Sequence, residues 1–137
     1  MDDDEALRRF GLHPVGADVE EARDLLRAAI LRGRRSQGDG DTELMRLFCV
    51  QLFHVGDLDD VLLIWAAKTA SFDADCSIDV QLLCGASLGP TIVYLANRPE
   101  PQAHAAHRRL LDCQEAGDFR EFSLEQYAAW YATYYAP

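Results

Sequence analysis

The sequence lacks a surplus of basic residues, a long apolar run and any C-x-x-C pair, and each absence excludes a class of protein. The formal net charge is -10 at pH 7. This charge disfavours general binding to nucleic acid or to an anionic membrane surface, because both need a basic footprint. The longest strongly apolar run, residues 61–67, is far too short to cross a bilayer. We therefore expect no nucleic-acid partner and no membrane insertion.

The N-terminus and the cysteines indicate the compartment. The stretch MDDDEALRR is acidic and has no apolar centre, so it does not fit a signal peptide. Cys49, Cys84 and Cys113 lie inside apolar helical stretches, where a free thiol behaves as a small hydrophobic group. We expect reduced thiols, a cytoplasmic location and no cofactor.

The hydrophobic pattern is helical almost throughout, and no segment alternates as a β-strand. A chain of 137 residues suits one all-α domain over residues 1–137. We expect about eight short helices, at residues 3–12, 19–31, 42–55, 58–72, 78–84, 91–97, 101–116 and 124–135. Short connections favour antiparallel hairpins, arranged either as a helical-repeat-like α–α superhelix or as an irregular bundle.

Several helix ends carry recognisable signals. Ser123 with Gln126 has the spacing of a capping box, and Asp57 is placed to cap the helix after Gly56. The helix over residues 42–55 is apolar on nearly every side, which predicts a central position. The stretch RGRRSQGDGDT is polar and glycine-rich, which predicts a flexible loop after the second helix.

The stretch 62–85 concentrates polar side chains directly after a dense apolar helix. Lys68 and Ser71 share a helix face, but K-x-x-S reverses the order of the serine–lysine motif and no oxyanion hole is visible. A structural interpretation is simpler: Lys68 suits a helix C-terminus, and Asp73 and Asp75 can bond backbone N–H groups in a loop before a helix begun at Ser77. We keep Lys68, Asp73 and Asp75 as candidate binding residues and name no catalytic residue.

Two patterns are compatible with metal binding, and both are incomplete. Oxygen-bearing side chains alternate as in a calcium loop at Asp73, Asp75, Ser77 and Asp79. However, Ile78 stands where such a loop needs glycine, and Cys84 stands where it needs a bidentate glutamate. His104 and His107 are one helical turn apart, but no third ligand is evident. We predict no metal site.

Arginines concentrate positive charge between residues 23 and 35 of this acidic chain. A solvated helix face is the plain interpretation. A contact with an anionic partner or a second subunit is the alternative.

The C-terminal stretch EQYAAWYATYYAP is rich in aromatic residues. Tyr127, Trp130, Tyr131 and Tyr134 recur at helical spacing and form one stripe, which is typical of a core face. Tyrosine and tryptophan also dominate binding hot spots. We expect part of the stripe to close the bundle and part to face a partner, with Trp130, Tyr134 and Tyr135 as candidate binding residues.

The segment GDLDDVLLIWAAKTASFDADCSIDVQLLCG resembles a family of small uncharacterised bacterial all-helical proteins, and the resemblance extends over residues 44–96. It implies an all-helical fold and supplies no site residues. Related small helical proteins include immunity proteins that block toxins by covering them, and an acidic surface would suit a basic toxin. This remains an analogy between classes of protein.

Taken together, these features favour a noncatalytic protein–protein interaction module of the immunity or adaptor type. Its partner would be another protein or a second copy of the chain. The alternative is a small-molecule-binding protein or an enzyme with a cleft between Lys68 and Asp79. We favour the first because the sequence contains no assembled catalytic set.

Overall fold

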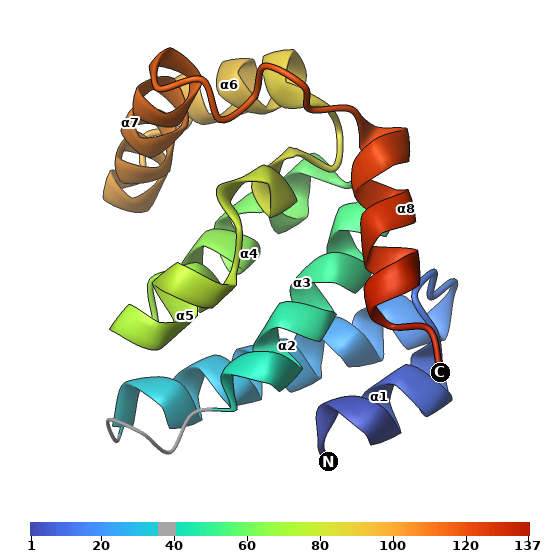
Figure 1. Cartoon of the computed structure of the whole chain (residues 1–137). Coiled ribbons are helices and arrows are strands. Elements are labelled where there is room, and N and C mark those ends of the chain that lie inside the picture. The colour runs from blue at the N-terminus through green and yellow to red at the C-terminus, as the bar shows by residue number, and fades with distance from the viewer. Residues whose placement is uncertain (36–40) are drawn as a thin grey trace.

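The computed structural model describes residues 1–35 and 41–137, which contain eight α-helices, two 3-10 helices and no strand (Figure 1). The all-α prediction is confirmed. The α-helices are α1 (Asp3–Phe10), α2 (Ala17–Arg35), α3 (Thr42–Val55), α4 (Val61–Lys68), α5 (Phe72–Ser77), α6 (Leu88–Ala96), α7 (Pro101–Glu115) and α8 (Leu124–Tyr134). The 3-10 helices are η1 (Leu58–Asp60) and η2 (Val80–Cys84). Among the described helices, none is both long and apolar enough to cross a membrane.

Helix α3 is the centre of the bundle, as its apolar composition predicts. Its side chains are buried at every position from Leu44 to Phe53 except Arg46, and α1, α2, α4, α5 and η2 pack around it. The Asp41 carboxylate accepts a hydrogen bond of 3.0 Å from the Leu44 N–H and caps its first turn. Gly56 ends the helix in the left-handed conformation, with φ of 73°.

The remaining helices differ in length and surround α3 as an irregular bundle (Figure 1). Helices α6 and α7 pair with each other at one end of the molecule, and α1 and α2 lie at the other. The segment after α7 crosses over to α8, which then runs back beside α3. Ser123 caps α8 as predicted, because its hydroxyl accepts a bond of 3.1 Å from the Gln126 N–H.

The segment expected as an aspartate-rich loop forms the short helix α5. The preceding helix ends at Lys68 rather than continuing to Phe72. Ser71 then caps α5 by accepting a hydrogen bond of 3.0 Å from the Ala74 N–H. Ser77 is consequently the last residue of α5 and does not begin the next helix.

Helix α2 also extends beyond its predicted end. Residues 32–35 of the expected loop remain helical, and Gly33 is buried within the last turn. Residues 36–40, the centre of that expected loop, lie outside the described residues.

Gly85 lies directly against the backbone at the end of α3. A Cβ atom at this position would lie 2.3 Å from the carbonyl oxygen of Phe53, whereas nothing lies within 4 Å of a Cβ at Gly89. We expect Gly85→Ala to lower the free energy of unfolding by about 1–3 kcal/mol, because backbone must move. Gly89→Ala lies in open space within helix α6 and should raise it by about 0.5–1 kcal/mol. Urea unfolding of both variants measures the difference, and equal midpoints would contradict the close approach.

Candidate functional site

Lys68 is the only lysine in the chain, and it is buried, with 4% of its surface exposed. Its ammonium donates hydrogen bonds to the carbonyl oxygens of Asp75, at 2.7 Å, and Ile78, at 2.6 Å. It also lies 3.0 Å from the Asp75 carboxylate. An ammonium has three donors, so these three acceptors use its full capacity. Lys68 therefore holds the C-terminal end of α5 and leaves no donor free for a ligand.

Asp75 is shared between Lys68 and an arginine that the sequence analysis did not single out. Arg109 of α7 donates two hydrogen bonds to the Asp75 carboxylate, at 2.9 and 3.1 Å. The guanidinium carbon of Arg109 also lies 5.3 Å from the centre of the Trp65 ring. The bonds from Arg109, with those from Lys68, lower the pKa of Asp75 to about 2. Asp75 thus stays ionised at neutral pH and joins α5 to α7.

The other candidates from the stretch 62–85 do not converge on one point. Asp73 is exposed on α5, whereas Asp79 faces α8 and is bonded there to tyrosine hydroxyls. The described residues include no group of three or more histidine, cysteine, aspartate or glutamate side chains that could hold a metal ion. His104 is exposed and His107 is half-buried on α7.

The aromatic stripe on α8 is divided between the core and the surface. Successive residues in an α-helix are rotated by about 100° around the helix axis. Viewed down this axis, Tyr131 and Tyr135 lie about 40° and 80° to one side of Tyr127, and Trp130 lies about 60° to the other side. The most buried member is Tyr131, at 1% exposure, and Tyr135 is half-buried with its hydroxyl enclosed. The hydroxyl of Tyr135 is therefore turned inward, while part of its side chain stays exposed.

The outer edge of the stripe is the exposed pair Trp130 and Tyr134. Their side chains remain 55% and 49% exposed, and their rings stack with centres 5.5 Å apart and planes inclined by 15°. Arg46 of α3 holds the Tyr134 side chain in place. It donates a hydrogen bond of 2.6 Å to the Tyr134 hydroxyl, and its guanidinium carbon lies 4.9 Å from the centre of the Tyr134 ring. Helix α8 thus presents a rigid aromatic surface to solvent.

Asp79 anchors the inner face of α8. Its carboxylate accepts hydrogen bonds from the hydroxyls of Tyr127, at 2.6 Å, and Tyr131, at 3.1 Å. Burial, together with the bond to Asp79, raises the pKa of Tyr127 far above its usual range, and burial and the Asp79 charge raise that of Tyr131. Both tyrosines therefore remain protonated donors, and they hold the Asp79 carboxylate in one orientation.

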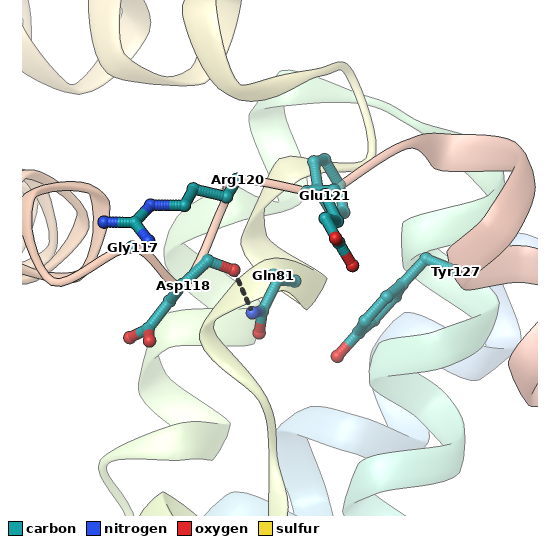
Figure 2. Close-up of a pocket in the computed structure, with 7 residues that line it drawn as sticks. Gln81, Gly117, Asp118, Arg120, Glu121 and Tyr127 are labelled. Carbon is teal, nitrogen blue, oxygen red and sulfur yellow. Dashed lines mark hydrogen bonds between the residues drawn. The ribbon is translucent and has the colours of Figure 1, made fainter.

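Two adjoining cavities lie between α8, the start of η2 and the connection from α7 to α8. We call them together the α8 groove. The larger has a volume of about 410 Å³ and is lined by Gln81, Gly117, Asp118, Arg120, Glu121, Phe122 and Tyr127 (Figure 2). The smaller has a volume of about 240 Å³ and is lined by Asp79, Glu121, Phe122, Ser123, Gln126, Tyr127 and Trp130. The second cavity reaches the exposed aromatic pair through Trp130.

The walls of the groove are organised by the segment between α7 and α8. Gln81 donates a hydrogen bond of 3.0 Å to the carbonyl oxygen of Asp118, which fixes this segment to η2. Figure 2 shows the Glu121 carboxylate and the Tyr127 side chain near each other, both on the side of the cavity where Gln81 lies. Arg120 extends the opposite way, and a Cβ atom at Gly117 would lie 3.2 Å from its guanidinium carbon. Glu121 therefore lines both cavities, whereas Arg120 lines only the larger one and extends toward Gly117.

Sequence reasoning identified part of this surface. Trp130 and Tyr134 were expected from the stripe, and the structure leaves both exposed beside the groove. Glu121 and Phe122 were missed because they follow α7 in an irregular segment without periodicity. The signal available there is the mixture of charged and aromatic residues in DFREF.

Comparison of the chain with protein-family models, curated proteins and solved structures finds no significant match. We consequently infer a function from the geometry of the described residues.

Proposed function

We propose that the protein is a noncatalytic protein-binding module that docks its partner on α8. The observation that carries this proposal is the exposed, stacked pair of Trp130 and Tyr134 at the edge of the α8 groove. Large aromatic side chains held rigidly at the surface lose little conformational freedom on binding, which is why they dominate hot spots.

The polar groups near α8 support binding rather than catalysis. The hydroxyls of Tyr127 and Tyr131 are committed to Asp79, and the Lys68 ammonium is committed to α5. A side chain that acts as a general base or nucleophile must have an atom free to contact the substrate at hydrogen-bond distance. The alternative is a small-molecule-binding protein or an enzyme with a cleft between Lys68 and Asp79. Lys68 was the residue that suggested this alternative, and its ammonium is used in a structural contact.

The charge of the chain favours a basic partner. The formal net charge is -10, and the carboxylates of Asp79 and Glu121 line the cavity beside Trp130. Complementary charge accelerates association and selects against acidic proteins. An immunity-type or adaptor-type role with a basic target protein fits this surface by analogy of class alone.

Site-specific photocrosslinking tests the location of the docking surface. A benzophenone side chain placed at position 134 should form an adduct with a basic protein, whereas the same group at Leu31, which is 54% exposed on α2, should not. The captured protein, once purified, should bind Trp130→Ala about 30-fold more weakly, a loss of about 2 kcal/mol for a hot-spot residue. Leu111→Ala on α7, where the side chain is 41% exposed, should bind normally.

Two outcomes would overturn the proposal. Equal affinity of Trp130→Ala and Leu111→Ala would place the docking surface elsewhere. Adducts formed only between copies of this chain, with a concentration-dependent dimer in sedimentation, would make α8 a self-association surface instead.

A further inference from the structure

The smaller cavity of the α8 groove combines two kinds of wall. Phe122, Tyr127 and Trp130 contribute aromatic rings, and Asp79 and Glu121 contribute carboxylates. Ring faces carry negative partial charge, so they attract cations, and carboxylates add full charge and hydrogen-bond acceptors. The cavity therefore offers an organic cation both apolar contact and charge neutralisation, and it repels anions.

These two carboxylates are not neutralised by the protein itself. Within the part of the chain that the structure describes, neither Asp79 nor Glu121 takes part in an ion pair. The Asp79 carboxylate is oriented by two tyrosine hydroxyls, which are neutral donors. Arg120, the neighbour of Glu121, extends toward Gly117 and away from the Glu121 carboxylate (Figure 2).

The same combination of groups already holds a cation elsewhere in this fold. Arg109 lies 5.3 Å from the centre of the Trp65 ring and forms two hydrogen bonds with the Asp75 carboxylate. A planar guanidinium can stack on a ring and pair with a carboxylate at the same time, whereas a compact ammonium is a hydrated point charge. The α8 cavity has the ring and the carboxylate of this arrangement without an internal arginine.

We propose that the smaller cavity receives the guanidinium group of an arginine side chain presented by the partner protein. The guanidinium would stack against the aromatic wall and pair with Glu121, while Trp130 and Tyr134 cover the adjacent partner surface. This inference rests on the proposed function, since it assigns the residue that the docking surface recognises.

An NMR titration with single-arginine peptides tests the assignment. The probes are acetyl-Gly-Arg-Gly-amide, its citrulline counterpart, which is neutral and of the same shape, and its lysine counterpart. We expect the arginine peptide to shift the indole N–H signal of Trp130 and the amide signals of Glu121 and Phe122 in a saturable manner at millimolar concentrations. The indole signal of the buried Trp65 should stay fixed and serves as an internal control.

Two charge variants complete the test. Glu121→Gln should weaken binding of the arginine peptide at least fivefold. Glu5→Gln removes the same charge from α1, at the other end of the molecule from the connection between α7 and α8, and should leave binding unchanged (Figure 1). Equal binding of the citrulline peptide, or equal effects of the two variants, would overturn recognition of a cation. Equal binding of the lysine peptide would overturn the assignment to a guanidinium.

The titration and the crosslinking can fail independently. A failed titration with successful crosslinking at position 134 would remove the arginine receptor and leave the docking surface in place. A saturable titration without any crosslinked protein would support the cavity and contradict the protein-binding role.

Discussion

A Lys68→Met variant is expected to lose about 3 kcal/mol of unfolding free energy, because burying polar groups without partners costs about 1–3 kcal/mol each. The substitution keeps the length of the side chain and removes the ammonium that bonds the carbonyl oxygens of Asp75 and Ile78. The Asp75 carbonyl lies in the last turn of α5 and the Ile78 carbonyl directly follows it, where helical partners are missing. The Asp75 carboxylate retains Arg109, so its charge is not left alone. Urea unfolding monitored by circular dichroism measures the loss.

A matched control and a chemical readout accompany this variant. Asp73→Asn changes an exposed side chain on the same helix and should alter the free energy of unfolding by less than about 0.5 kcal/mol. Because Lys68 is the only lysine, acetylation by an N-hydroxysuccinimide ester reports its accessibility directly. We expect the native protein to leave Lys68 unmodified and the urea-unfolded protein to be acetylated there. Rapid acetylation of native Lys68, or wild-type stability of Lys68→Met, would restore the alternative of a ligand or enzyme site at this residue.

The fold was predictable where local signals and burial agree. The apolar surface of α3, the cap at Ser123 and the stop at Gly56 each act within a few residues, so they can be recognised in the sequence. The all-helical architecture follows from the repeated 3.6-residue spacing, which requires no knowledge of distant contacts.

Helix α5 was missed because a side chain outside the helix satisfies its C-terminal end. Its six residues are too few for a hydrophobic period, and aspartates at 73 and 75 are equally typical of turns. Ser71 was the available local signal for its start. The donor that satisfies its C-terminal end comes from Lys68, seven residues before Asp75, through a contact that only the packed structure reveals.

The candidate site was predictable only as a helix face. Periodicity placed Trp130 and Tyr134 on α8, but it did not decide which edge of the stripe would turn outward. That choice depends on Asp79, which draws Tyr127 and Tyr131 inward from 48 and 52 residues away in the sequence. The groove likewise needs the segment from Gly117 to Phe122 to meet η2, which is a tertiary arrangement without a sequence period.

An Arg23→Met variant is expected to be destabilised by about 3–5 kcal/mol, because it leaves a buried charge without its partner. Arg23 of α2 donates two hydrogen bonds of 2.8 Å to the Asp60 carboxylate, and the Asp60 side chain is only 5% exposed. The bond to Asp60 raises the pKa of Arg23 above its usual value. Asp60 precedes α4 but does not cap it with its side chain, because its oxygens are used by Arg23. The pair thus joins α2 to the start of α4.

The neighbouring Arg27 supplies the control for this variant. Arg27 lies one turn further along α2 and pairs with Asp24, with both side chains more than half exposed. Arg27→Met should therefore cost less than about 0.5 kcal/mol. In Arg23→Met, adding Asp60→Asn removes the unpaired charge and should recover part of the loss, whereas the same change in the wild type should destabilise. If Arg23→Met and Arg27→Met unfold at the same urea concentration, the Arg23–Asp60 contact does not hold the two helices together. If Asp60→Asn gives no recovery, the loss comes from packing of the arginine stem rather than from the stranded carboxylate.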